Sequence, residues 1–311
     1  MRQVKITKNF VTQLSKELGQ KIELKNQFKS GRANPVFPIK LKEGNCILKL
    51  YDKRKLRMFM TNIKVYGLLK KEKLITDVVK SGKWEGGRYL VLKKIEGKDF
   101  TEVIKDLSQK DINKIAFDLG KIVAKFHSLK NDQFGELYSP KFKNWKSYLE
   151  KLNNNRLKKL KGHDFEYFIP RIRMYLKENE KLIIDIKKGS FVHDDLQPQN
   201  FIINKKKLVG VIDFDGVFWG DPMFELPYIE SSMKHVLKSR VLSSFIERFY
   251  RGYESVKKLN WKKREKVEIY YSVCKLLRHM SGFPSLKERL GKRIGKRVKK
   301  SFISSMEKAL K

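Results

Sequence analysis

Residues 193–225 read HDDLQPQNFIINKKKLVGVIDFDGVFWGDPMFE, and this stretch decides the fold class of the chain. It interrupts long regions of helical apolar spacing with two short β-like runs, 201–203 and 208–214, joined by a turn of lysines. Within it, Asp195 lies five residues before Asn200, and Asp213 follows Asn200 by thirteen residues at the end of the second run. The stretch predicts a β-hairpin that Asp195 and Asn200 precede in the sequence and that Asp213 ends.

The spacing of these three polar residues suits the transfer of a phosphoryl group. That reaction needs a carboxylate that orients the accepting hydroxyl and takes its proton, and oxygen ligands that hold Mg²⁺ against the phosphates. Asp195 fits the first task, and Asn200 and Asp213 fit the second. Asp and Asn are also common turn residues, so an ordinary turn is the alternative. The combination of HxDxxxxN, a hairpin and Ile-Asp-Phe at this interval favours the chemistry.

The residues before Gly97 predict a small antiparallel sheet with one helix inserted. The expected strands are 21–28, 35–41, 46–51 and 89–95, and the expected helices are 4–18 and 54–72. The segment KSGKWEGG, residues 80–87, predicts a turn. Because Glu96-Gly97 closes the last strand, we divide the chain there into domains 1–97 and 98–311.

After Gly97 the apolar spacing becomes helical. Residues 111–128 repeat apolar positions at i, i+3, i+4 and i+7, which predicts a helix. The other regions expected to be mostly helical are 141–188, 225–281 and 286–311. The fold class is therefore α+β, with a small β-rich part followed by a larger helical one.

The 193–225 stretch resembles the aminoglycoside phosphotransferase and choline kinase superfamily, which has a two-lobed protein-kinase-like fold. The matching residues are His193, Asp195 and Asn200, then Ile-Asp-Phe ending at Phe214, and Gly-Asp-Pro containing Asp221. The resemblance implies a nucleotide-binding N-terminal lobe and a C-terminal catalytic and substrate lobe. It also implies that ATP, with GTP as an alternative, donates a phosphate to a small-molecule hydroxyl.

The same resemblance implies a role for each matching residue. Asp195 would be the catalytic base, and Asn200 and Asp213 would bind Mg²⁺. His193 and Asp221 would support the catalytic loop without contacting the substrate.

The first lobe matches the superfamily more loosely. Lys49, on the third expected strand, resembles the lysine that contacts the α- and β-phosphates. Gly31 lies in a turn that resembles the phosphate-covering turn, although a plain hairpin turn fits these residues equally well. Lys93 and Ile95 belong to the segment that resembles the adenine-binding hinge, with a buried strand as the alternative. His127 matches a recurrent helix-end histidine, for which we expect packing rather than catalysis.

Three positions depart from the superfamily pattern. Residues 54–71 contain no Asp or Glu, so the usual helix carboxylate partner of Lys49 is missing, and Asn62 takes its place by position. Asp194 stands where the superfamily usually has glycine, and we expect its side chain to point into solvent. Gln197 replaces the lysine of protein Ser/Thr kinases, which argues against a protein substrate.

The chain of 311 residues has 71 Lys and Arg against 34 Asp and Glu, a net charge of +37. A Lys-rich composition spread over all solvated faces is the favoured interpretation. The alternative is a catalytically weak kinase-like protein that binds RNA or an anionic membrane, with the basic helix 286–311 as its surface. A polycationic aminoglycoside is disfavoured as substrate by this charge, and a neutral or anionic metabolite fits at least as well.

Bulk features place the chain among cytoplasmic proteins. Its two cysteines, Cys46 and Cys274, lie far apart and form no metal-binding pattern. No apolar run approaches 18 residues, and the N-terminal residues have scattered charges rather than an apolar segment. We expect a soluble cytoplasmic monomer.

Overall fold

The computed structural model describes residues 6–28 and 34–311, with the side chains of 289–292 left out. The chain forms two compact units. The first comprises residues 1–115 and 198–216, and the second comprises residues 116–197 and 217–311. The hairpin region therefore belongs with the N-terminal residues. These units do not follow the division at residue 97, which stays a prediction.

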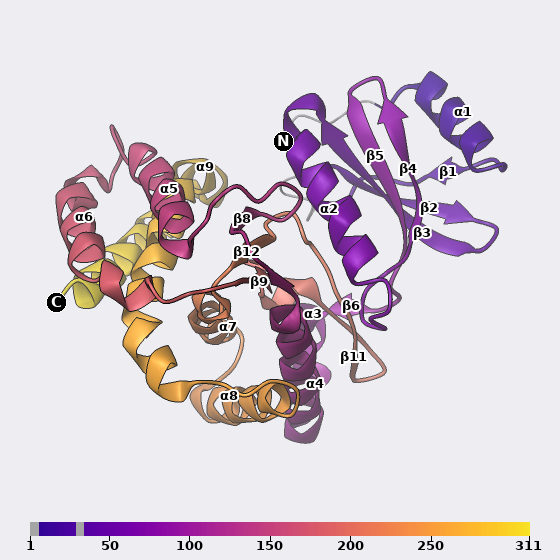
Figure 1. The fold of residues 1–311 in the computed structure, drawn as a ribbon. Helices are drawn as coiled ribbons and strands as arrows, with labels where there is room; N and C mark the ends of the chain where they lie inside the picture. Colours follow the sequence, from indigo (N-terminus) through magenta and orange to yellow (C-terminus); the bar gives the residue numbers. More distant parts are fainter. Residues whose placement is uncertain (1–5, 29–33) are drawn as a thin grey trace. The chain divides into compact units, whose positions relative to one another are not determined.

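The first unit is built on a five-stranded antiparallel sheet with the strand order β1-β2-β3-β5-β4 (Figure 1). The strands are β1 (Glu23–Leu24), β2 (Val36–Leu41), β3 (Gly44–Asp52), β4 (Val78–Trp84) and β5 (Gly87–Lys93). The turn predicted over 80–87 is wrong, because most of that segment is β4. Gly82 suggested a turn, but it pairs with Tyr89 in the sheet, and a Cβ on Gly82 would lie 2.6 Å from the Tyr89 ring.

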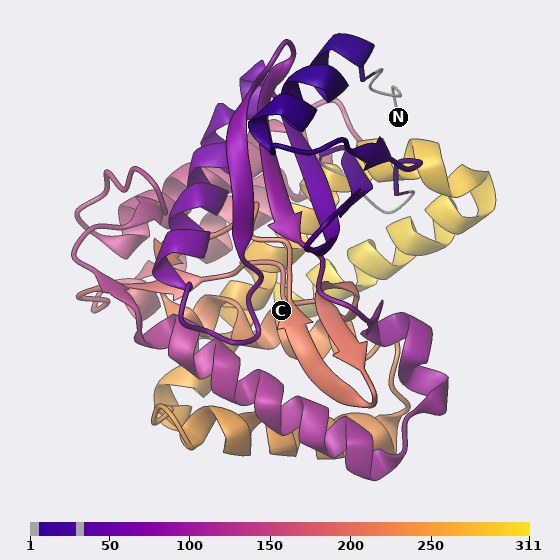
Figure 2. The same cartoon turned by 90° about the vertical axis from the view of Figure 1, so that its right-hand side faces the viewer.

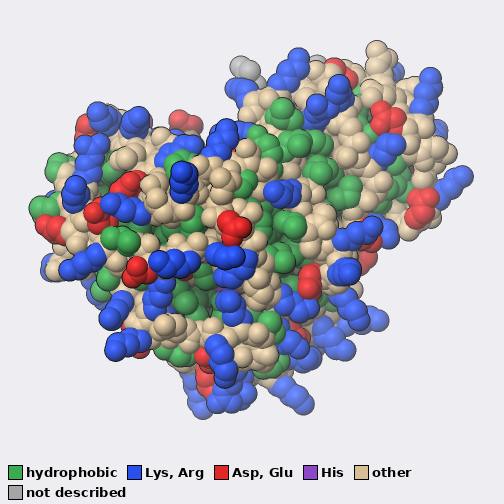
Figure 3. Space-filling model, viewed as in Figure 1, with side chains coloured by type: hydrophobic (Ala, Val, Ile, Leu, Met, Phe, Trp, Pro, Cys, Tyr) green, Lys and Arg blue, Asp and Glu red, His purple; other side chains and the backbone are tan. Residues whose placement is uncertain are grey.

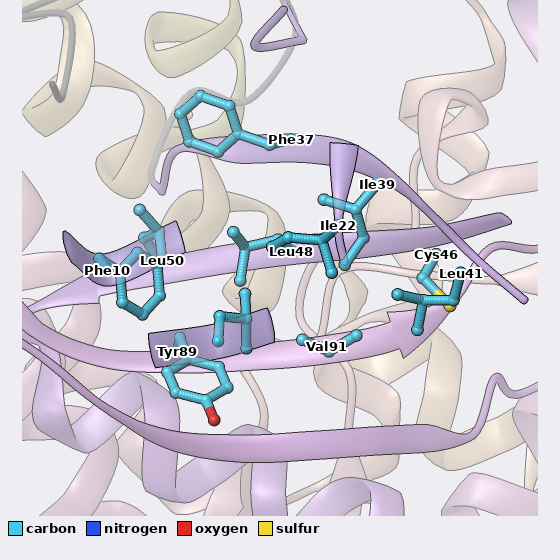
Figure 4. Close-up of a cluster of buried hydrophobic side chains, with 11 residues drawn as sticks. Phe10, Ile22, Phe37, Ile39, Leu41, Cys46, Leu48, Leu50, Tyr89 and Val91 are labelled. Carbon is cyan, nitrogen blue, oxygen red and sulfur yellow. The ribbon is translucent and has the colours of Figure 1, made fainter. Parts of the chain in front are cut away.

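The two faces of this sheet are covered by different helices, α1 (Lys8–Glu17) and α2 (Leu56–Leu68). Side chains alternate along β3, so that Leu48 and Leu50 face the apolar cluster that includes Phe10 of α1 (Figure 4). Lys49 and Tyr51 therefore face the other side, where the Tyr51 ring lies 5.7 Å from that of Phe59 in α2. This alternation directs the lysine towards α2.

A second, three-stranded sheet completes the first unit. It has the order β11-β10-β6 and consists of β6 (Lys98–Asp99), β10 (Phe201–Asn204) and β11 (Lys207–Val211). Short helices adjoin it, namely α3 (Phe100–Val103), η2 (Ile104–Asp106) and η5 (Pro198–Asn200), whereas η1 (Lys53–Lys55) follows β3 in the first sheet. The predicted hairpin is confirmed, and its strands pair Phe201 with Val211.

The second unit is mainly helical, as the sequence predicts. Its helices are α5 (Trp145–Lys158), η3 (Glu166–Phe168), α6 (Ile169–Glu178), η4 (Glu180–Ile183), η6 (Pro222–Phe224), α7 (Leu226–Met233), α8 (Ser239–Glu254) and α9 (Trp261–Ala309). The long helix α4 (Gln109–Ser128) contributes most of its length to this unit and confirms the prediction for 111–128. A short sheet with the order β7-β9-β12-β8 contains β7 (Lys130–Asn131), β8 (Gly135–Glu136), β9 (Gly189–Val192) and β12 (Phe218–Gly220).

Helix α9 folds back on itself (Figure 2). The rings of Phe283 and Phe302 lie 5.9 Å apart, whereas nineteen residues of straight helix would separate them by about 28 Å. Pro284 interrupts the backbone hydrogen-bond ladder directly after Phe283. The returning half packs Met306 into the same apolar cluster as Phe165 and Leu277. The helix predicted over 286–311 is thus the second half of α9.

Across the described residues, no helix combines the length and the apolar character needed to cross a bilayer.

Candidate active site

Asp195 lies in the loop that follows β9 in the second unit. Its carboxylate accepts a hydrogen bond from the Gln197 side-chain amide at 2.9 Å and one from the Tyr228 hydroxyl at 3.4 Å. The side chain remains 23% exposed. Asp195 is thus a carboxylate with a fixed position that a substrate hydroxyl can still reach. A general base needs such access, because it must come within hydrogen-bond distance of the proton that it takes.

His193 and Asp221 lie behind this loop and are both buried. The His193 ring stacks near Phe126, and its Nδ1 accepts a hydrogen bond from the Asp195 backbone N–H at 3.3 Å. Asp221 accepts hydrogen bonds from the Met223 N–H at 3.0 Å and from the Tyr271 hydroxyl at 2.7 Å. Burial and the adjacent Asp221 raise the pKa of Tyr271 well above its ordinary value, so its proton stays in this bond.

A buried hydrogen-bond network also holds the loop. The sequence analysis did not predict that its members contact one another. Glu225 accepts a hydrogen bond from the Asp194 backbone N–H at 2.8 Å and lies 2.6 Å from His127 Nε2. The other ring nitrogen of His127 lies 2.9 Å from the Tyr253 hydroxyl. His127, Glu225 and Tyr253 are all fully buried. The helix-end histidine thereby links α4, α8 and the residue before Asp195.

Asp194 does not point into solvent, so that expectation was wrong. Its carboxylate is buried and pairs with Lys275 and, at 2.5 Å, with Arg278, both from α9. Burial alone would raise the pKa of Asp194, but the charges of Arg278 and Lys275 lower it below the ordinary value. The backbone φ of Asp194 is +67°, a left-handed conformation that glycine adopts most easily and Asp tolerates. This geometry explains why glycine is usual at the position.

In the first unit, Asn200 and Asp213 lie at the same end of the β10–β11 hairpin. Asn200 directly precedes β10, and its carbonyl oxygen accepts a hydrogen bond from the Ile212 N–H at 3.0 Å. Asp213 follows Ile212 and has a φ of +68°, with 42% of its side chain exposed. The pair offers a carboxylate and an amide oxygen, the hard ligands that Mg²⁺ prefers, so the residues fit this ion. Among the described residues, no group of three His, Cys, Asp or Glu side chains forms a metal site.

Lys49 contacts carboxylates of the segment after β11. Its Nζ lies 2.8 Å from Asp215 and 3.3 Å from Asp213. Burial alone would lower the pKa of Lys49, but Tyr51 and the carboxylates of Asp215 and Asp213 raise it well above its ordinary value. The ammonium group therefore stays charged.

Asn62 does not take the place of the missing helix carboxylate. Its side-chain amide donates a hydrogen bond to Asp215 at 2.8 Å, and Asn34 donates another to the second oxygen of Asp215 at 2.7 Å. Asp215, a residue to which the sequence analysis assigned no role, thus supplies the negative charge beside Lys49. Its place two residues after Asp213 in Asp-Phe-Asp is the signal that could have identified it.

The remaining nucleotide-site predictions have different outcomes in the structure. Gly31 lies outside the described residues. Lys93 ends β5, and its backbone N–H and C=O are already bonded to Asp77 and Thr76, at 3.0 and 2.5 Å. Ile95 follows the strand and packs against Gly210 of β11. Of these two hinge residues, only Ile95 keeps its backbone free of hydrogen bonds within the described parts of the chain.

Comparisons with known proteins agree with this arrangement. The chain is similar to an aminoglycoside phosphotransferase in complex with gentamicin, with 19% identity over 97% of this chain and 96% of that chain and a TM-score of 0.66. A candidate aminoglycoside phosphotransferase from Ralstonia eutropha is 13% identical, with 98% of this chain and 98% of that chain covered and a TM-score of 0.70. A candidate fructosamine-3-kinase from Haemophilus somnus is 17% identical, with 97% of this chain and 95% of that chain covered and a TM-score of 0.64. No curated protein matches the sequence.

The structural likeness confirms the predicted two-lobed protein-kinase-like fold. The predicted resemblance to aminoglycoside phosphotransferases is confirmed as well, because a sequence family described as the phosphotransferase enzyme family matches residues 26–280. Since that match spans more than half of the 311 residues, the chain belongs to the phosphotransferase enzyme family.

Proposed function

We propose that the protein transfers the γ-phosphate of ATP to a hydroxyl of a small molecule, with Asp195 as base and Mg²⁺ held by Asn200 and Asp213. The observation that carries this proposal is the joint position of Asn200 and Asp213 at one end of the hairpin, with Lys49 in contact with Asp213. This set combines two oxygen ligands and one buried cation, which is what binding a metal–triphosphate complex requires.

In this proposal Asp195 orients the acceptor hydroxyl and takes its proton as the new phosphoester bond forms. The Gln197 amide and the Tyr228 hydroxyl hold the two carboxylate oxygens, which reduces the reorganisation needed during the reaction. His193 and Asp221 act through the loop backbone and its flanking helix, because neither side chain is exposed. Only four residues lie between Asp195 and Asn200 in the sequence, so the proposed base and a proposed metal ligand share one short segment.

Lys49 binds the α- and β-phosphates in this proposal, and Asp215 holds it. Asn34 and Asn62 fix both oxygens of Asp215, so the lysine has a defined position before nucleotide arrives. Asn200 and Asp213 would hold the Mg²⁺, which would supply neutralisation of the phosphate charge. Gly31, Lys93 and Ile95 remain proposed nucleotide contacts. Because the backbone of Ile95 is unbonded among the described residues, Ile95 is better placed than Lys93 to bind the adenine ring.

The proposal of a small acceptor has two supports. The side-chain amide of Gln197 donates its hydrogen bond to Asp195. Gln197 also lacks the positive charge of the lysine that protein Ser/Thr kinases have at this position. Solved structures with this fold include an aminoglycoside phosphotransferase in complex with gentamicin and another in complex with ADP and hygromycin B, and both bound compounds are small molecules.

A nucleic-acid or membrane role for the basic surface has no comparable support. Lys and Arg side chains spread over the whole face seen in Figure 3, with acidic side chains between them. In α9, Lys287 and Lys299 both pair with Asp164, at 3.0 and 2.8 Å.

Titration of ATP against the wild type and Asp213→Ala, with and without Mg²⁺, tests this proposal. We expect Mg²⁺ to tighten binding to the wild type by about tenfold or more, since a charge-assisted contact contributes roughly 1.5–3 kcal/mol. Asp213→Ala should lose that gain, and Asp132→Asn, a surface variant of a side chain that is 84% exposed, should keep it. A wild type that does not bind Mg·ATP would overturn the proposal. Parallel titration with GTP identifies the donor.

A further inference from the structure

Arg278 of α9 places its guanidinium group beside Asp195. Its Nη1 donates to the Asp194 carbonyl oxygen at 2.6 Å and pairs with the Asp194 carboxylate at 2.5 Å. Its Nη2 lies 3.9 Å from the nearer Asp195 oxygen, too far for a hydrogen bond. The arginine side chain is 31% exposed. One edge of the guanidinium group is therefore anchored and the other faces the surroundings of Asp195.

The free edge still has hydrogen bonds to give. A guanidinium group carries five N–H donors in a rigid planar arrangement. Within the part of the chain that the structure describes, Nη2 and Nε of Arg278 donate no hydrogen bond, which leaves three donors. Paired donors in this geometry match the two oxygens of a carboxylate or phosphate.

Arg278 is not needed merely to neutralise Asp194. Lys275, itself buried, already pairs with that carboxylate. Glu225, another carboxylate close to this loop, is fully buried and bonded to His127 and to the Asp194 backbone. Arg278 thus shares the neutralisation of Asp194 with Lys275 and forms a longer ion pair with Asp195, while its remaining N–H donors are available to a group outside this set.

Tyr228 and Gln197, which donate hydrogen bonds to the Asp195 carboxylate, carry no charge. His279 stacks on Tyr228 at 5.6 Å between ring centres, and burial, with the charges of Arg278 and Lys275, lowers its pKa to about 4. It is therefore neutral near pH 7. An amine brought to Asp195 would meet Arg278 and find no unpaired acid in this cluster, whereas an anion would find free donors.

We infer that Arg278 recognises the acceptor, and that the acceptor carries a carboxylate or phosphate group close to the hydroxyl that is phosphorylated. This inference rests on the proposed function and names its substrate class. It assigns Arg278 to specificity, while Lys275 and Asp194 hold the loop.

The test uses three six-carbon polyols that differ at one end: gluconate, sorbitol and glucamine. Apparent affinity is measured for each in the presence of Mg·ADP at constant ionic strength, and KM and kcat wherever ADP release from Mg·ATP is stimulated. We expect the wild type to prefer gluconate by about ten- to a hundredfold, the effect of hydrogen bonds to a charged group. Arg278→Gln should reduce this preference to within about twofold, mainly through KM.

Two further variants keep the result interpretable. Arg278→Lys retains the charge and the contact with Asp194 but loses the planar donor pair, so it should fold and show an intermediate preference. Arg251→Gln removes an equal charge from α8, where the arginine is 60% exposed and pairs with Glu247, and should keep the full preference.

The inference is wrong if the wild type shows no preference for gluconate, or if Arg278→Gln retains one. A merely structural role would lower kcat for all acceptors alike and leave their ranking unchanged. Failure of the wild type to bind Mg·ATP would instead remove the proposed function itself. Intact Mg·ATP binding without anion preference would remove only the substrate class.

Discussion

Asp194 and Asp213 have the same unusual backbone conformation, with φ of +67° and +68°. Non-glycine residues adopt it rarely, and it costs of the order of 1–3 kcal/mol unless surrounding contacts maintain it. Asp194 is maintained by Lys275 and Arg278, and Asp213 by the paired hairpin before it. In both cases the carboxylate pairs with a cation from another element, Lys49 for Asp213 and Lys275 and Arg278 for Asp194, so the cost accompanies the placement of charge.

At the residue scale, Asp215 provides the first prediction. Asp215→Asn should lower the rate of phosphate transfer by about ten- to a hundredfold, because a buried Lys49 would keep only the 3.3 Å contact with Asp213. The measurement is ADP release at saturating Mg·ATP, with thermal unfolding as a check on folding. The double variant Asn62→Asp, Asp215→Asn should recover part of the rate, since it returns a carboxylate to the position that α2 lacks.

Asp132→Asn serves as the charge-matched control, because Asp132 makes only an exposed pair with Lys188. A rate for Asp215→Asn equal to that of this control would show that Asp215 does not support Lys49.

At the element scale, the crossing of α4 and α8 determines how the buried network meets the loop. A Cβ on Gly120 would lie 2.0 Å from the Phe249 carbonyl oxygen, and one on Gly252 would lie 2.0 Å from that of Phe117. The helices therefore approach through two glycines, in agreement with the two views in Figures 1 and 2. This close approach brings Tyr253 to His127.

Gly252→Ala should destabilise the protein by about 1–3 kcal/mol, the usual cost of overpacking, because backbone atoms on α4 cannot rotate away. Chemical denaturation measures this change in the free energy of unfolding. Gly282→Ala is the matched control, since nothing lies within 4 Å of its added Cβ and alanine favours a helix by about 0.8–1 kcal/mol. Equal stability of the two variants would mean that the helices separate without cost.

Elements with strong local signals could be predicted from sequence. Helix α4 repeats its apolar positions over five turns, and the hairpin is bounded by Asn200 and Asp213 within one short stretch. Strand β4 could not be predicted, because Gly82 indicates a turn and only its pairing with Tyr89 in the sheet explains it. The reversal of α9 depends on Phe165 and Phe283 packing around Phe302, contacts that join distant parts of the sequence.

At the scale of the whole molecule, the predicted site residues are close together in the sequence, whereas the missed ones meet partners that are distant in the sequence. Asp195, Asn200 and Asp213 lie within nineteen residues, so their spacing carries the signal. Asp215 meets Lys49 across 166 positions, and Lys275 meets Asp194 across 81. In a chain with 71 Lys and Arg, nothing in the sequence marks which cation is buried against a carboxylate.

The net charge of +37 is likewise a property of the whole chain rather than of one surface. Most of it lies on separated side chains, whose interactions are screened over about 8 Å at physiological ionic strength. What matters for the acceptor is the local balance of charge around Asp195, where Arg278 lies 3.9 Å away and keeps unbonded donors among the described residues.

The transfer rate of Asp195→Asn tests the central claim most directly. Turnover of Mg·ATP is measured with the most active polyol for the wild type and this variant, alongside Mg·ATP affinity. Because a general base contributes about 10²- to 10⁴-fold, we predict a rate lower by about a thousandfold with nucleotide affinity changed less than about threefold. A variant that transfers phosphate within about tenfold of the wild type would contradict the assignment of Asp195 as the base.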